Sequence, residues 1–409
     1  MSKKAAGIVQ PAAKVHRFEV HQNIKTMSEL IVSKIKNHFP NHTIPCLKTF
    51  LLLMNCILQC RTVCLYKCRD KVKSTKKQNV NNDYARLIRF FKMKNIKDFI
   101  AGISTLMFSI GEVDLTYLIV DRTNWKRGAK NFNLLTIGNL KQNNFIPLHW
   151  LQLNKSGGSN TNDRKTLIEG MCTFAARVGK TIKGSILLAD REFIGQEWFE
   201  YLLSKELSFV IRLREKMYFE LQTNKGKRKT SLKSFRKSVE KYGIFAIPMI
   251  LGDTTYTFVM IKNPKYDPKV PYIYFISDIN DARAIANHYL KRWKIECCFK
   301  HLKSNGFNIE NINLKNDDKI ELMMGILAIV YLIALKAGLL RHLEKPIPAK
   351  KYKNGKVYLS ISIFRMGLAI IQFIFTTIKK ILTYIEHQLK ANKESHWGGF
   401  NNFIFLKYV

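Results

Sequence analysis

Acidic residues are scarce in this chain of 409 residues, which has 30 Asp and Glu against 68 Lys and Arg and a formal net charge of +38. An excess of this size indicates a polyanionic partner, because clustered cations attract phosphate at long range and release its counterions. Lys, Asn, Ile and Phe are all abundant, as expected of an AT-rich genome, but that bias leaves the shortage of acids unexplained. Nucleic acid is the predicted partner. An anionic membrane surface and codon bias alone are the alternatives.

Long hydrophobic runs are also missing. The longest, Leu322–Leu335, has 14 residues and stops at Lys336, and the next, Met366–Phe375, is shorter. A membrane-spanning helix needs about 20 apolar residues, so both runs predict buried core helices and no membrane partner. The N-terminal stretch has no apolar segment typical of a signal peptide, which favours the cytoplasm. With 46% apolar and 11% aromatic residues, the chain is expected to be globular, with two or three domains.

Cysteine provides no visible metal motif. Cys56, Cys60, Cys64 and Cys68 are spaced by four residues. A zinc site needs a turn between ligand pairs, or His partners from another element, and neither is apparent. We expect these thiols to be buried along one side of a helix.

Residues 1–110 are predicted to form a basic helical region. The first hundred residues carry 20 Lys and Arg against 5 Asp and Glu, and apolar residues recur at helical spacing over Thr49–Leu65 and Tyr84–Leu106. Short β-favouring runs follow at Leu115–Val120, Asn131–Leu140 and Phe145–Leu153. A helix, the strand Gly184–Ala189, a second helix and the strand Ser208–Leu213 complete a βββ-α-β-α-β order. This order predicts an α/β core over residues 111–215 and 277–310.

Residues 216–276 interrupt that rhythm. A basic turn at Asn224–Lys229 precedes strands Phe245–Leu251, Tyr256–Ile261 and Tyr272–Ile276, which predicts an inserted β-rich subdomain. Helices are then expected over 281–303, 318–343 and 361–389, so that residues 311–409 form a C-terminal helical region. The last helix is a candidate for pairing two protomers, and the alternative is a helical cap on the core.

Two aspartates follow hydrophobic strands directly. Asp121 comes after Tyr117–Val120, and Asp190 comes after Ile186–Ala189. A carboxylate at the end of a buried strand emerges at the carboxyl edge of the sheet, where α/β active sites collect. Neighbouring strands would bring the two carboxylates within a few ångströms. Each aspartate alone is also typical of a turn that ends a strand.

A third carboxylate lies on the helix predicted before residue 303. At about 100° per residue, Glu296 shares a face of that helix with several basic and aromatic residues. An ordinary solvated face with a weak Arg292–Glu296 ion pair is the alternative. The residues on this face are Tyr289, Arg292, Trp293, Glu296, Lys300 and Lys303.

Three converging carboxylates without a histidine constellation suit hard, oxygen-seeking cations such as Mg²⁺ or Mn²⁺. Two such ions about 4 Å apart activate an attacking oxygen and stabilise the leaving oxygen during displacement at phosphorus. Basic residues on the same helical face would hold flanking phosphates. The predicted chemistry is phosphodiester cleavage or exchange.

At these residues the chain resembles the DDE transposases of bacterial insertion sequences, in the branch with a Tyr-Arg-Glu-Lys (YREK) signature. The resemblance covers residues from about 113 to 305. It is carried by Val120–Trp125, by Leu188–Phe193, and by Tyr289–Glu296 continuing to Lys303. The third segment is the most specific, because its spacing and the Trp after the Arg both match.

The resemblance implies an RNase H-like core with a β-strand insertion before the last catalytic helix. It implies that Asp121, Asp190 and Glu296 bind two Mg²⁺ ions, and that Tyr289, Arg292 and Lys303 contact DNA at the transposon end. Members of this branch typically cleave and rejoin DNA through a hairpin intermediate. Residues 1–110 are then expected to recognise terminal inverted repeats, and a homodimer to hold two DNA ends. Trp293 is a candidate to stack on a flipped base, with a core position as the equal alternative.

Two other functions compete with a Mg²⁺-dependent DNA transposase. One is a DNA-binding protein without catalysis, such as an inactive transposase relic, although retention of all three carboxylates argues against decay. The other is a two-metal nuclease that cleaves DNA without joining it. The protein sequence separates this nuclease poorly from a transposase.

Overall fold

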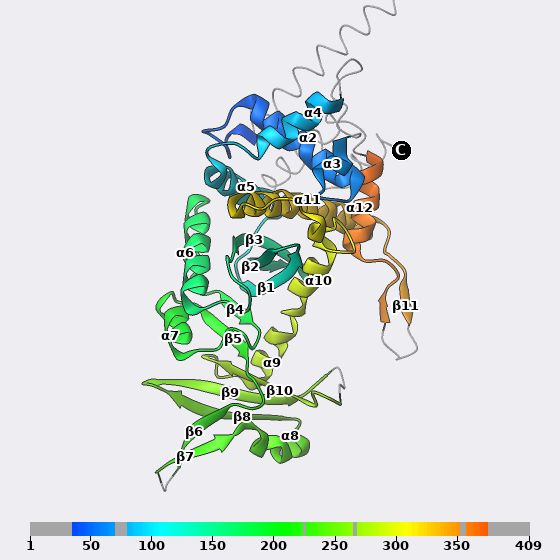
Figure 1. Cartoon of the computed structure of the whole chain (residues 1–409). Coiled ribbons are helices and arrows are strands. Elements are labelled where there is room, and N and C mark those ends of the chain that lie inside the picture. The colour runs from blue at the N-terminus through cyan, green and yellow to red at the C-terminus, as the bar shows by residue number, and fades with distance from the viewer. Residues whose placement is uncertain (1–34, 70–79, 224–225, 265–267, 352–356, 375–409) are drawn as a thin grey trace, which may run out of the picture.

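The computed structural model describes residues 35–69, 80–223, 226–264, 268–351 and 357–374. These residues form a mixed α/β structure in which helices flank a mixed sheet of eight strands (Figure 1). The predicted α/β class is therefore confirmed. The predictions for residues 1–34, and for the last helix beyond residue 374, lie outside the described residues.

Five strands form the first part of the sheet, in the order β3-β2-β1-β4-β5. The first three are antiparallel, whereas β4 runs parallel to β1 and β5 runs parallel to β4. Helix α6 precedes β4 and α7 follows it, so the predicted βββ-α-β-α-β order is confirmed. The bounds are β1 Tyr117–Arg127, β2 Lys130–Lys141, β3 Asn144–Gln152, α6 Thr161–Arg177, β4 Ile186–Ala189, α7 Gln196–Ser204 and β5 Ser208–Arg212.

Strands from the predicted insertion extend this sheet. It continues from β5 through β10 and β9 to β8, and each of these pairs is antiparallel. A separate hairpin of β6 and β7 lies beside them with α8 (Figure 1), and the predicted basic turn lies partly in β7. The bounds are β6 Tyr218–Thr223, β7 Gly226–Ser231, the 3-10 helix η2 Leu232–Phe235, α8 Arg236–Tyr242, β8 Ile244–Leu251, β9 Thr254–Lys262 and β10 Tyr272–Ser277.

Within residues 35–69 and 80–116, four complete helices precede the sheet, whereas the sequence predicts two long ones. They are α2 Ile44–Cys60, α3 Leu65–Cys68, α4 Val80–Phe90 and α5 Ile96–Gly111. Helix α2 ends because Arg61 adopts a left-handed conformation with φ of 50°. The prediction that all four spaced cysteines share one helix is therefore wrong. Cys56 is buried in α2, Cys68 is buried at the end of α3, and Cys64 lies between the two helices.

Helix α11, Asp317–Glu344, contains the longest apolar run and packs against α5, α12 and β3. It is long and apolar enough to span a bilayer, but 94% of its apolar window is buried inside the protein. Helix α12, Ile363–Ile374, approaches it closely at two glycines. A Cβ on Gly338 would lie 1.9 Å from the carbonyl oxygen of Ile363, and one on Gly367 would lie 1.7 Å from that of Ala334. Only glycine permits this contact.

The remaining elements are α9 Ala282–Leu290, α10 Trp293–Leu302, the 3-10 helix η3 Ile309–Asn311, β11 Ala349–Lys351 and β12 Val357–Leu359. Strands β11 and β12 form a short hairpin where a loop was predicted. Helix α10 packs against β1 and β3, and α9 packs against β4 and β5. These two helices therefore carry the predicted third carboxylate to the strands that carry the first two.

Candidate active site

Asp121 and Asp190 lie side by side, directly after the last paired residues of two neighbouring parallel strands. Val120 of β1 pairs with Ala189 of β4, and this is the last parallel pair between the strands. Asp121 directly follows Val120, and Asp190 directly follows Ala189. The expectation that Asp121 ends its strand is wrong, because β1 continues to Arg127 in antiparallel pairing with β2. Asp121 therefore lies inside a strand, which restricts its backbone more than a turn would.

The helix predicted to run unbroken to Lys303 is divided at residues 291 and 292. Helix α9 ends at Leu290 and α10 begins at Trp293. The amide N–H groups of Arg292 and Ile295 donate to carbonyl oxygens three residues earlier rather than four. This local tightening is of the 3-10 type. Arg292 lies in the tightened turn and turns its side chain into the protein.

Arg292 connects two of the three carboxylates. Its guanidinium donates from one terminal nitrogen to Asp121 Oδ2 at 2.8 Å, and from the other to Glu296 Oε1. The Arg292 residue is only 6% exposed. A buried guanidinium is stable only when it is paired, and here both of its partners are candidate catalytic residues.

Tyr289 contacts the remaining carboxylate, that of Asp190. Its hydroxyl donates to Asp190 Oδ1 at 3.4 Å, and its ring lies 4.7 Å from the ring of Phe275 in β10. Tyr289 is 7% exposed, so the phenol is held by packing as well as by this contact. The Arg292 guanidinium carbon lies 5.7 Å from the centroid of the Tyr289 ring. Asp121, Asp190, Glu296, Tyr289 and Arg292 therefore lie together in one group, which we call the carboxylate cluster.

Charge is concentrated in this cluster. Burial raises the pKa of Asp121 to about 6, and the nearby Asp190 and Glu296 add to this rise while Arg292 opposes it. Burial likewise raises the pKa of Tyr289 to about 12. Burial would lower the pKa of Arg292, but its anionic neighbours outweigh burial and raise it. Arg292 therefore remains a cation that offsets repulsion among the three acids.

The three acids offer only oxygen donors, which suits Mg²⁺ or Mn²⁺ better than a softer metal. Their mutual repulsion also favours a neighbouring cation. Among the described residues, however, no three His, Cys, Asp or Glu side chains are arranged to hold one ion. Arg292 holds Asp121 and Glu296 instead. A metal ion that bound all three carboxylates would have to displace these ion pairs.

The other predicted contact residues lie outside the cluster. Lys303 pairs with Glu310 at 3.0 Å and donates to the carbonyl oxygen of Asn124 at 3.3 Å. Trp293 is 47% exposed at the start of α10, so it is not a core residue. Lys300 is also exposed. These three side chains lie on α10 or directly after it, where they remain predicted DNA contacts.

A second ion pair, which sequence reasoning missed, ties the two aspartate-bearing segments together. Arg122 donates to Glu192 from Nε at 3.1 Å and from a terminal nitrogen at 3.0 Å. Glu192 also accepts from the amide and hydroxyl of Ser159, at 2.7 and 2.9 Å. Buried Arg164 in turn donates to the carbonyl oxygens of Ser159 and Glu192, each at 2.8 Å. Arg122 is the residue after Asp121, and Glu192 lies two residues after Asp190, so their opposite charges were the available signal.

Removing this ion pair should loosen the site. We expect Arg122→Ala to lower the free energy of unfolding by about 2 kcal/mol, because charge-assisted hydrogen bonds to Glu192 are lost in a partly buried setting. Chemical denaturation measures the change. Lys183→Ala, which removes an exposed pair with Glu206, is the matched control and should cost less than about 1 kcal/mol. Equal losses in the two variants would show that the Arg122–Glu192 pair has no special structural role.

The sequence model of the family described as "Transposase DDE domain" matches residues 116–333. This match spans more than half of the chain. The chain belongs to the DDE transposase family. All residues of the carboxylate cluster lie within the matched segment of this DDE transposase, which ends inside α11.

No curated protein matches the chain. Among solved structures it is similar to the "Cryo-EM structure of piggyBac transposase synaptic complex with hairpin DNA (SNHP)", with 10% sequence identity and a TM-score of 0.41. That alignment covers 91% of this chain and 81% of the other. A TM-score this low does not establish a shared fold.

Proposed function

We propose that this chain is an active DNA transposase of the Tyr-Arg-Glu-Lys branch found in bacterial insertion sequences. It would bind terminal inverted repeats and catalyse Mg²⁺-dependent strand cleavage and strand transfer. The observation that carries the proposal is the carboxylate cluster. Tyr289, Arg292 and Glu296 of the signature contact the cluster aspartates or one another. Decay of the gene would give no reason for this arrangement to persist.

The strand arrangement supports an RNase H-like catalytic core. Three antiparallel strands are followed by two parallel ones, with Asp121 on the central strand of the five and Asp190 directly after its parallel neighbour. We further propose that residues 111–215 and 277–310 make up this core, with residues 216–276 as the insertion. Residues 311–409 would be the C-terminal helical region.

In the proposed mechanism, Asp121, Asp190 and Glu296 would hold the divalent metal. When bound, Mg²⁺ would supply Lewis-acid stabilisation of the oxygens at the reacting phosphorus. Arg292 would leave its ion pairs and, with Lys303, contact the phosphates that flank the scissile bond. Tyr289 would keep Asp190 oriented, because its hydroxyl already donates to that carboxylate. Exposed Trp293 and Lys300 would add contacts to the DNA end.

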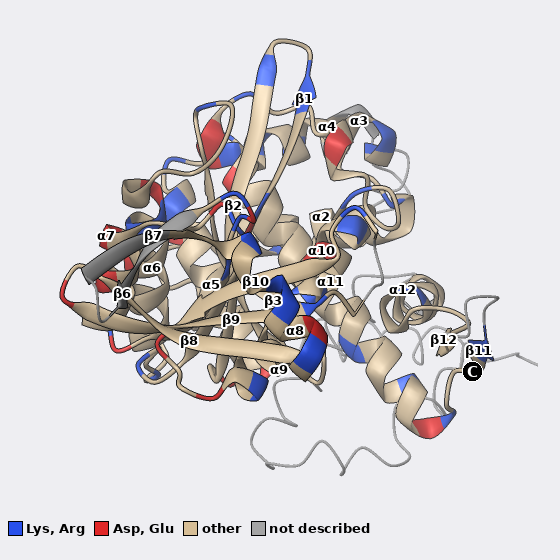
Figure 2. Ribbon diagram, turned by 90° about the horizontal axis from the view of Figure 1, so that it is seen from below, with Lys and Arg blue, Asp and Glu red and all other residues tan. Residues whose placement is uncertain are grey.

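The reaction that we infer proceeds through a DNA hairpin. Water cleaves one strand, and the released 3′-OH attacks a phosphodiester of the opposite strand, whose 3′ oxygen leaves as the new bond forms. Water then hydrolyses the hairpin phosphodiester, and the freed 3′-OH attacks a phosphodiester of target DNA, whose 3′ oxygen leaves as the new bond forms. The basic residues are spread over many elements (Figure 2), which supports contact with a long polyanion. Residues 1–110 would recognise the inverted repeats, and a homodimer would hold two ends.

A single assay separates this proposal from its alternatives. Purified protein is incubated with Mg²⁺ and duplex oligonucleotides carrying the inverted repeats that flank the coding region. Hairpin or joined products are expected. Cleavage without hairpin or joining would instead identify a nuclease. A mobility shift without any product would identify a DNA-binding protein without catalysis.

A further inference from the structure

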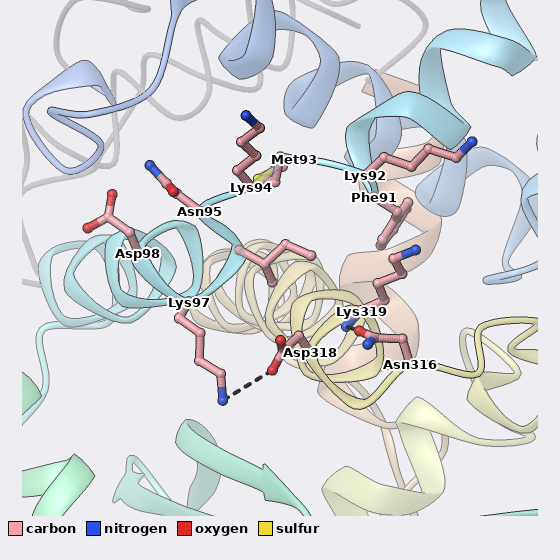
Figure 3. Close-up of a pocket in the computed structure, with 11 residues that line it drawn as sticks. Phe91, Lys92, Met93, Lys94, Asn95, Lys97, Asp98, Asn316, Asp318 and Lys319 are labelled. Atoms are coloured by element: carbon pink, nitrogen blue, oxygen red, sulfur yellow. Dashed lines mark hydrogen bonds and ion pairs between the residues drawn. The ribbon is translucent and has the colours of Figure 1, made fainter.

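A groove separate from the carboxylate cluster lies between the start of α5 and the start of α11 (Figure 3). It encloses about 550 Å³. One wall comes from the segment between α4 and α5, and the other comes from the first turn of α11. The polar and charged residues that line it are Lys92, Lys94, Asn95, Lys97, Asp98, Asn316, Asp318 and Lys319.

Lysines outnumber acids along the groove. Asp318 forms an ion pair with Lys97 at 3.1 Å, as drawn in Figure 3, and Asp98 Oδ2 lies 3.0 Å from Nε2 of His42, which is charged only when protonated. Lys92, Lys94 and Lys319 have no acidic partner within the part of the chain that the structure describes. Lys92 and Lys94 are exposed, and Lys319 is half-buried. Four lysines against two aspartates leave a net charge of +2 along one concave surface.

We infer that this groove binds the sugar-phosphate backbone of duplex DNA. Lysine side chains around a groove attract phosphate without reading base sequence, because each ammonium acts as a point charge. The first turns of α5 and α11 add a smaller positive potential, but the three lysines carry the inference. It rests on the proposed function, and it adds a contact surface outside the carboxylate cluster.

The groove lies beside the hairpin that carries one of the cluster aspartates. Lys130, at the start of β2, pairs with Asp317 at 2.6 Å, and Arg127, at the end of β1, donates to the carbonyl oxygen of Ile312 at 2.9 Å. The β1–β2 hairpin, which carries Asp121, thus ends beside the start of α11. DNA in the groove would contact both the N-terminal helices and the segment that belongs to the DDE family. It would link the proposed repeat-binding region to the catalytic core.

The test is a triple substitution, Lys92→Ala with Lys94→Ala and Lys319→Ala. Fluorescence anisotropy with a labelled duplex of arbitrary sequence gives Kd over a range of salt concentrations. Each lost phosphate contact should reduce the slope of log Kd against log salt by about 0.9, so we expect a reduction of about 2 to 3. We expect Kd at about 0.1 M salt to rise at least about tenfold. The triple Lys→Arg variant should bind like the wild type.

A matched control removes three lysines from the opposite end of the sheet, with Lys141→Ala, Lys180→Ala and Lys183→Ala. It should change Kd and the salt slope clearly less than the groove variant does. Equal effects in the two triple variants would overturn the groove assignment alone, as would DNA affinity retained by the groove variant. Loss of binding to anionic vesicles with intact DNA affinity would assign the groove to membranes instead. A wild-type chain that binds no DNA would overturn the proposed function together with the groove.

Discussion

Asp190→Asn is expected to reduce Mg²⁺-dependent DNA cleavage at least about a thousandfold, because losing a metal-binding charge removes several kcal/mol of transition-state stabilisation. Asp190 is the most informative of the three acids. Its carboxylate accepts a 3.4 Å hydrogen bond from Tyr289, whereas those of Asp121 and Glu296 hold Arg292 in place. Amidation at 190 therefore changes the charge with little disturbance of the ion pairs. Single-turnover cleavage of an inverted-repeat duplex measures the effect.

The comparison requires that the variant still binds DNA. Its Kd for the same duplex, measured in Ca²⁺ so that no turnover occurs, should stay within a few-fold of the wild-type value. Asp253→Asn, in the exposed turn between β8 and β9, is the matched control and should cleave at close to the wild-type rate. Wild-type cleavage by Asp190→Asn would remove Asp190 from the catalytic residues and weaken the two-metal proposal.

Arg292→Ala is expected to destabilise the metal-free protein by about 3 kcal/mol, because two carboxylates would lose the buried guanidinium that pairs with both. Mg²⁺ should then restore part of this loss. A ligand at ten times its Kd adds about 1.4 kcal/mol, and the variant should bind Mg²⁺ more tightly than the wild type because no ion pair has to be broken first. Thermal unfolding with and without Mg²⁺, at constant ionic strength, measures both effects.

Two further variants test whether the loss of stability in Arg292→Ala is specific to the paired guanidinium. Arg292→Lys keeps the charge but loses the paired geometry of the guanidinium, so its stability should lie between those of Arg292→Ala and the wild type. Lys294→Ala, two residues away on α10, should change the free energy of unfolding by less than about 0.5 kcal/mol. If Arg292→Ala melted like the wild type, or gained no more from Mg²⁺ than the wild type does, Arg292 would not occupy the place of a metal ion.

The strand and helix order of the core was predictable because its signals are local. The runs around Val120 and Ala189 are continuous and apolar, and a polar residue ends each run. The full length of β1 was not predictable in this way. Residues 122–127 are mostly polar and resemble a loop, and they stay extended because β2 pairs with them to the last residue. Membership of β8 and β9 in the same sheet likewise depends on the antiparallel pairing of β10 with β5.

The candidate site was predictable in its members but not in its connections. The spacing of Tyr289, Arg292 and Glu296 predicts that they share a helical face, whatever that face contacts. The pairing of Arg292 with Asp121 joins residues 171 positions apart and requires the folded sheet. The tight turn at residues 291 and 292 contains neither Pro nor Gly, so no local signal marks it. The same holds for the end of α2, where Arg61 takes a conformation that usually favours glycine.

The continuous sheet determines how the proposed insertion can move. Five strand-to-strand steps separate β1 from β8, and at about 4.8 Å per step they span about 24 Å. Backbone hydrogen bonds join each pair of neighbouring strands, so β8 is held to β1 by a continuous sheet without a hinge. A nucleotide gripped by β8 or β9 would be held at a set distance from Asp121. To reach the carboxylates, DNA held there would have to bend, because the sheet does not allow β8 and β9 to move toward Asp121.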